Sequence, residues 1–216
     1  MGFLQRTVSF FTWEVLDGPL PDHRQDLLDS LVRGRIGPID VDLGRDQAAG
    51  FSLFEDPLDT EFTEANVFFD PLVAFSFRMD RLSVPPSTYR LYFRRRLAET
   101  LAAGQRSRLR KEEREELADR VRMELLRRCL PAITAHEVVW DVPKRRIRLF
   151  TTAARAREEF ADRARKDLGL TLRPLHLQGV LEHGLAPEEY ERVLGLLPSR
   201  FGGGLWFDPA TEEESR

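Results

Sequence analysis

Alternation of apolar and polar positions predicts strands near both ends of the chain. The opening segment 8–13 is rich in residues that favour strands, and the apolar residues of 39–43 alternate with acidic ones at the strand period. Further strands are predicted at 50–54, at 170–177 and in a pair within 67–77 that turns at Asp70-Pro71. A hairpin is predicted from strands at 138–142 and 147–149, with a turn that begins at Pro143 and Lys144.

Apolar residues spaced by three or four positions predict two long helices in the middle of the chain. The first follows Pro85-Pro86, with Ser87 as its cap, and ends at Gly104. The second runs from about 112 to 130, with Leu117, Val121 and Leu125 on its buried face. Three shorter helices are also predicted. One follows a cap at Asp22 and has the apolar face Leu27, Leu28, Leu31 and Val32. Another covers 153–168 with Phe160 and Ala164 inward, and the last runs from Pro187 to Leu197.

The order of these elements predicts an α+β fold with mixed or antiparallel sheets and a pair of long charged helices. We expect four parts. They are a β-rich part at 1–84, the helix pair at 85–131, a ββαβ(α) part at 132–200 and a flexible tail at 201–216. The glycine run 202–204 belongs to that tail.

Composition is that of a folded chain with a heavily charged surface. Hydrophobic residues make up 42% of the 216 positions and charged residues 32%. Cys129 is the only cysteine, so neither an internal disulfide nor a cysteine-based zinc site is expected. No signal peptide is recognisable, and the most apolar stretch, 65–77, is too short to span a bilayer. We therefore expect a cytoplasmic protein without membrane contact.

The near-neutral net charge hides a separation along the chain. The total is −3, from 33 basic and 36 acidic side chains, and 30 of the basic ones are arginine. Residues 78–166 hold 24 basic and 13 acidic side chains, a net charge of +11, which leaves −14 for the rest. The total alone argues against nucleic-acid binding, whereas the basic middle favours it.

Three clusters dominate this basic middle. The first is a triplet on one helix, whose members fan over about 200° and cannot all face one row of phosphates. The second lies in the connection between the long helices, and the third lies on the hairpin, where Lys144, Arg146 and Arg148 share one face as a basic strip. The predicted DNA-binding residues are Arg94, Arg95 and Arg96, then Arg106, Arg108, Arg110 and Lys111, and finally Lys144, Arg145, Arg146 and Arg148.

Clustered cations without a base-reading motif are suited to nucleic-acid phosphates. Solvated helix faces with salt bridges are the plainer interpretation, which we favour for 112–128 because acidic residues intermix there. Pairing of the basic middle with the acidic ends, in one chain or between two copies, is a further alternative.

Catalytic and metal-binding patterns are missing from the sequence. His176 and His183 lie seven positions apart, unlike the pairs of a helical metal site, and no HExxH, phosphate loop or G-x-S-x-G motif occurs. Asp40 and Asp42 share one face of a predicted strand and could hold a metal, although exposed strand acids are commoner. We expect no catalytic residues, no metal site and no cofactor.

The stretch from Phe68 to Leu177 resembles the bacterial recombination-associated protein RdgC family. The features that carry the resemblance are a strand ending near Arg78, the junction 82–86, the charged helix pair that ends in Leu130-Pro131, Val139-Trp140-Asp141 within a hairpin, the helix 153–168 and the strand 172–177. The opening 1–4 and the motif 84–86 resemble a short-form subgroup.

The resemblance implies a non-enzymatic, nucleoid-associated protein that binds single- or double-stranded DNA with little sequence preference. Members of the family form a homodimeric ring around the duplex and limit the access of a RecA-like recombinase. Whether this shorter chain closes such a ring stays open. Two other functions also stay open: a protein-interaction module whose basic centre docks an acidic partner or another copy, and, with little support, a metal-dependent nuclease.

Overall fold

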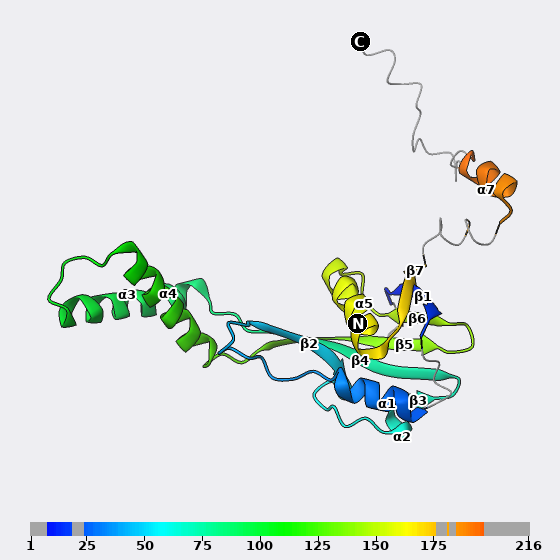
Figure 1. Cartoon of the computed structure of the whole chain (residues 1–216), viewed down its shortest axis with the longest axis horizontal. Helices are drawn as coiled ribbons and strands as arrows, with labels where there is room; N and C mark the ends of the chain where they lie inside the picture. Colours follow the sequence, from blue (N-terminus) through cyan, green and yellow to red (C-terminus); the bar gives the residue numbers. More distant parts are fainter. Residues whose placement is uncertain (1–7, 19–23, 176–180, 182–184, 197–216) are drawn as a thin grey trace, which may run out of the picture. The chain divides into compact units, whose positions relative to one another are not determined.

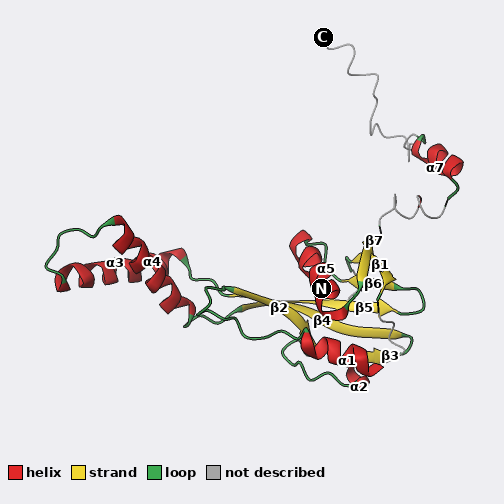
Figure 2. Ribbon diagram, in the orientation of Figure 1, coloured by secondary structure: helices red, strands yellow, loops and turns green. Residues whose placement is uncertain are grey.

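The computed structural model describes residues 8–18, 24–175, 181 and 185–196 of the chain (Figure 1). Two compact units are distinguished, Met1–Leu175 and His176–Arg216, and the described part of the second is mainly helix α7 (Pro187–Leu194). The first unit contains the sheet and the other described helices (Figure 2). The fold is α+β, as predicted.

One antiparallel sheet carries every described strand, in the spatial order β2-β4-β5-β6-β1-β7, with β3 also paired to β4. Its longest ladder joins β4 to β5 over ten residue pairs, from Leu72↔Asp141 to Arg81↔Ala132. Strands on either side of the predicted helix pair thus share one sheet. Their bounds are β1 Phe11–Asp17, β2 Gln47–Ser52, β3 Phe68–Phe69, β4 Leu72–Arg81, β5 Ala132–Asp141, β6 Arg146–Leu149 and β7 Thr171–Pro174.

Helices α1 (Arg24–Arg33) and α5 (Ala154–Leu168) supply the apolar side chains that cover one face of the sheet. Because side chains alternate along a strand, one face of β5, β6 and β1 carries the row Trp140–Ile147–Trp13 in register. The ring of Phe160 from α5 packs against this face, 5.3 Å from Trp13 and 5.5 Å from Phe77. The predicted inward residues of these two helices are therefore mostly confirmed, although Val32 is 41% exposed.

The remaining described helices are α2 (Glu64–Val67), α3 (Pro86–Ala103) and α4 (Lys111–Leu126). Figure 1 shows α3 and α4, in green, side by side beyond the ends of β2 and β4. We call residues 86–126 the arm. A small cluster of Val41, Leu82 and Leu126 lies at its base, with Met123 and Cys129 packed against it.

Several predicted boundaries are wrong. Residues 39–43 form no strand, since the N–H of Gly44 donates to the carbonyl of Val41 in a turn, and the apolar pattern there reflects packing of Val41 at the base of the arm. Ser87 is no cap, because α3 already begins at Pro86, where proline needs no N–H partner. The second long helix ends at Leu126 rather than near 130. The predicted cap Asp22, the end of the strand 170–177 and the tail lie outside the described residues.

A close approach of backbones shapes the edge of β2. Residues 34–36 pair with Phe51, through the Phe51 N–H to the Gly34 carbonyl (2.9 Å) and the Ile36 N–H to the Phe51 carbonyl (3.0 Å). Gly50 makes this possible, because a Cβ there would lie 2.5 Å from the backbone nitrogen of Ile36. The approach fixes Arg35 beside the sheet.

Candidate nucleic-acid interface

The two helices of the arm hold each other through one narrow apolar seam. Leu117, Val121 and Leu125 of α4 are buried there, whereas α3 has no buried residue. Tyr89, Phe93 and Leu97 recur every four positions on α3 and pack against this cluster. All other faces of α3 are therefore available to solvent or to a partner.

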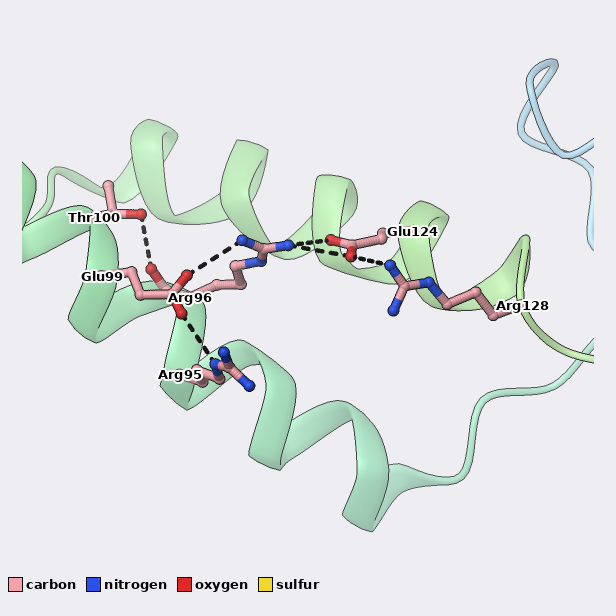
Figure 3. Close-up of polar contacts among 6 residues, drawn as sticks. All are labelled: Arg95, Arg96, Glu99, Thr100, Glu124 and Arg128. Carbon is pink, nitrogen blue, oxygen red and sulfur yellow. Dashed lines mark hydrogen bonds and ion pairs between the residues drawn. The ribbon is translucent and has the colours of Figure 1, made fainter.

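The arginines of the α3 triplet differ in their partners, because successive helix residues point in different directions. Arg96 reaches across to α4 and bonds both carboxylate oxygens of Glu124 at 3.1 and 3.0 Å (Figure 3), contacts that raise the pKa of its guanidinium. Arg95 bonds Glu99 on its own helix at 3.0 Å. Arg94 makes no side-chain hydrogen bond or ion pair with any described residue.

The connection between the helices holds the second predicted cluster. Arg106 bonds Glu113 at 2.9 Å, and the backbone N–H of Arg110 donates to the same carboxylate at 2.8 Å. The Arg110 N–H, opposed by burial and helped by the Arg106 guanidinium, lowers the pKa of Glu113. Lys111 lies 4.0 Å from Glu115, and the exposed Arg108 side chain contacts no acidic group of the described chain.

Charge is divided between the two sides of the arm. Residues 86–111, which comprise α3, the connection and the first residue of α4, contain eight basic side chains and one acidic one, Glu99. Residues 112–126 of α4 contain three basic and six acidic side chains. Two of the predicted clusters thus belong to one strongly basic stretch of the arm, 86–111, whose cations point in several directions.

Side chains of the hairpin cluster make hydrogen bonds within the fold that were not predicted. Lys144 bonds Asp141 at 3.0 Å, and the guanidinium of Arg145 donates to the backbone carbonyls of Val15 and Leu16, each at 3.0 Å. Arg146 does lie on the face away from Ile147, but its register neighbours there are acidic.

Those neighbours interrupt the predicted basic strip at Arg146, whereas Arg148 stands between Thr12 and Val139. Asp141, Arg146, Glu14 and Arg173 stand in register across β5, β6, β1 and β7, so that acid and base alternate. Cross-strand pairs of opposite charge stabilise a sheet, which is sufficient reason for these cations. Burial opposes the charge of Asp141, yet the hydrogen bonds from Lys144 lower its pKa.

The hairpin and the arm do not form one site. The arm joins the sheet at Arg81 and Ala132, whereas the hairpin turn follows Asp141 at the other end of the same ladder. Ten residues of strand span about 30 Å. A straight ligand would have to follow the whole length of the sheet to touch both.

The structure also forms a groove that the sequence did not predict. It has a volume of about 530 Å³ and lies where β2, β4 and β5 extend beyond the aromatic core, beside the start of α5. Basic residues from four segments line it. They are Arg35, Arg45, Arg81, Arg155 and Arg163. No local spacing links these positions, and only the sheet register and the course of 35–45 bring them together.

Of the residues considered for catalysis, Asp42 forms an ion pair with Arg127, and Asp40 accepts the Leu43 N–H at 3.2 Å within a turn. His23, His176 and His183 lie outside the described residues, and His136 lines the groove. Among the described residues, no group of three or more acidic, histidine or cysteine side chains is placed to hold a metal ion.

Helices long and apolar enough to cross a membrane do not occur in the described part of the chain. Comparison with protein-family models gave no match, and comparison with curated protein sequences gave none either.

Proposed function

We propose that the protein is a non-enzymatic, sequence-independent DNA-binding protein, whose basic surface on α3 and the α3–α4 connection contacts phosphates. The resemblance to the RdgC family supports this proposal. By the same resemblance, we propose that the protein acts as a homodimer and limits access of a RecA-like recombinase to DNA. The observation that carries it is the eight-to-one excess of cations over 86–111.

The state of these cations also favours phosphate contact. Arg94 and Arg108 have no acidic partner among the described residues, so they need not give up an ion pair to bind a phosphate. Arg95 and Arg106 are 78% and 59% exposed in their pairs, and exposed ion pairs stabilise by only about 0–1 kcal/mol. A phosphate row can replace such partners at little cost.

The mechanism is electrostatic. Each guanidinium that contacts a phosphate releases condensed counterions, so binding weakens steeply as salt is raised and is insensitive to base sequence. Occupied DNA is then closed to other proteins, which is how binding without catalysis would restrain a recombinase.

The test compares two double variants that remove the same charge. Arg94→Gln with Arg108→Gln removes two cations of the arm that have no acidic partner among the described residues, and Arg165→Gln with Lys166→Gln removes two exposed cations from the last turn of α5. Fluorescence anisotropy with labelled duplex and single-stranded DNA is measured from low to moderate salt. We expect the arm variant alone to bind more weakly, with a plot of log K against log salt shallower by about two.

Three outcomes would contradict the proposal. One is an affinity that does not change with salt, another is an equal loss in both double variants, and the third is no DNA binding by the full chain. A complex with an acidic protein or a second copy, seen by light scattering without DNA, would in that last case favour the interaction module instead.

A further inference from the structure

The floor of the groove is a continuation of the helix-covered face of the sheet. Ala49, Met79 and Thr134 stand in register across β2, β4 and β5, one step beyond the aromatic core. Small and apolar side chains at this level leave the hollow of about 530 Å³. Sites for small organic ligands usually have volumes of roughly 300–1,000 Å³ and largely apolar walls.

Three cations around this hollow have no partner among the residues that the structure describes. Arg155 bonds Gln47, and Arg163 bonds Asp167 and the carbonyl of Ala49. By contrast, the exposed side chains of Arg35, Arg45 and Arg81 make no hydrogen bond or ion pair with the described chain. Guanidinium groups present a fork of donors that matches phosphate oxygens, so three unpartnered ones on one groove favour an anion.

The start of α5 adds a second feature that favours negative charge. Ala153, Arg155 and Ala156 line the groove at the N-terminal end of this fifteen-residue helix. No side chain caps the helix, and its first turn contains no acidic residue. The free N–H groups and the positive end of the helix dipole are therefore available to an anion.

The acidic residues of the groove point to the rest of the ligand. Asp80 is paired with Arg78 at 2.6 Å, and Asp40 accepts the Leu43 N–H. Glu159 has no partner among the described residues and can accept hydrogen bonds from hydroxyl groups. Half-buried His136 adds one more polar group to a largely apolar floor.

We propose that this groove binds a phosphate monoester of nucleotide size whose body carries hydroxyl groups, with the phosphate held by Arg35, Arg45 and Arg81 near the start of α5. Such a phosphate is found on free nucleotides and sugar phosphates, and also at the 5′ end of a nucleic-acid strand. This site is separate from the basic surface of the arm and does not depend on the proposed DNA binding.

The first experiment is isothermal titration calorimetry of the full chain with adenosine 5′-monophosphate, ribose 5-phosphate and unphosphorylated adenosine. We expect at least one of the two phosphate esters to bind and adenosine to bind at least tenfold more weakly, because adenosine leaves the arginines unpaired. The absence of binding by both esters, or equal binding of adenosine and its monophosphate, would overturn the proposal.

Variants then locate the site. Arg45→Gln and Arg81→Gln should each weaken ester binding about tenfold, whereas the arm variant Arg94→Gln with Arg108→Gln should leave it unchanged. Circular dichroism verifies that each variant is folded. Equal binding by the groove variants and the original protein would remove the groove from consideration.

A measurement on the unaltered protein gives a result that does not depend on whether the variants fold. The ester should protect Arg35, Arg45 and Arg81 from modification by phenylglyoxal, as mapped by mass spectrometry, and should leave Arg94 and Arg108 reactive. Protection of the arm arginines alone would overturn the assignment.

A final comparison separates the two sources of the phosphate. A thymidine dinucleotide is titrated with and without its 5′-phosphate, beside the free monophosphate. Tighter binding of the phosphorylated dinucleotide identifies a strand end as the source, and tighter binding of the free ester identifies a small metabolite. If the 5′-phosphate strengthens the binding of neither the dinucleotide nor the nucleoside, the proposal fails, whether or not residues 86–126 bind DNA.

Discussion

The sheet core and the arm use apolar residues in different ways. In the core, Phe160 is fully buried and its ring packs against aromatic rings from two strands, while two helices cover the face. In the arm, two helices share a single seam, and α3 buries no residue at all. The core thus supplies most of the stability. The arm exposes its charged side chains and buries little apolar surface. Regions with few buried contacts open at lower free energy than cores.

The largest expected effect comes from the core. Phe160→Ala removes a ring that contacts Trp13 and Phe77, and large-to-small changes of this kind cost about 3–5 kcal/mol. Urea denaturation followed by circular dichroism should show the whole first unit destabilised. A loss below about 1 kcal/mol would mean that the core is not the dominant source of stability.

A smaller and more local effect is expected in the arm. Leu117→Ala opens the seam between α3 and α4 and should cost about 2 kcal/mol, the low end for such changes, because few neighbours surround this site. Hydrogen exchange should speed up in α3 and α4 and stay unchanged in β4 and β5. Equal acceleration in the sheet would show that arm and core unfold together.

A pH-dependent effect of about 1 kcal/mol or less is expected at the far end of the ladder. The pKa of Asp141 is lowered in the folded protein, although burial opposes this, because Lys144 bonds the carboxylate. The stabilisation is therefore complete above the ordinary pKa of about 3.9 and is lost progressively as the pH falls from there through the lowered pKa of the folded protein.

Asp141→Asn should accordingly be less stable than the original protein at pH 7, and this difference should shrink as the pH falls through the lowered pKa of Asp141. Denaturation at pH 7 and at the lowest pH at which the original protein is folded checks this expectation. A difference of the same size at both would assign the effect to packing rather than charge.

The smallest effect is expected where the arm meets the core. Asp42 and Arg127 form an ion pair whose side chains are 75% and 59% exposed, so Asp42→Asn should cost less than about 0.5 kcal/mol. Thermal melting and hydrogen exchange of α4 measure this loss. A loss above 1 kcal/mol would show that the pair fixes the arm and would weaken the contrast between the two regions.

Sequence patterns correctly predicted those elements and inward-facing residues that are determined within a short stretch of chain. The 138–149 hairpin, the inward face of α5 and the seam residue Val121 follow from periods that a short window contains. The segment 39–43 misled the same reasoning, because its apolar side chains pack at the base of the arm rather than in a sheet.

The candidate site was predictable only where charge clusters in sequence. The basic stretch of the arm was predicted in this way, whereas the basic strip of the hairpin is interrupted at Arg146 because Glu14, more than a hundred residues earlier, stands beside it. Arg35, Arg45 and Arg81 come together through register and a glycine at position 50, and no spacing rule contains that information.

The register of the central ladder has one more consequence. Arg81 and Ala132 are partners in adjacent strands, so the fifty residues from 82 to 131 leave the sheet and return to it side by side. Strands β4 and β5 thus form a β-hairpin whose loop is the fifty-residue segment 82–131. A single insertion could have added the arm, and a single deletion closed by a tight turn would remove it while every strand keeps its neighbour. Sites of this kind, with adjoining ends, are where folds best tolerate a gain or loss of whole segments.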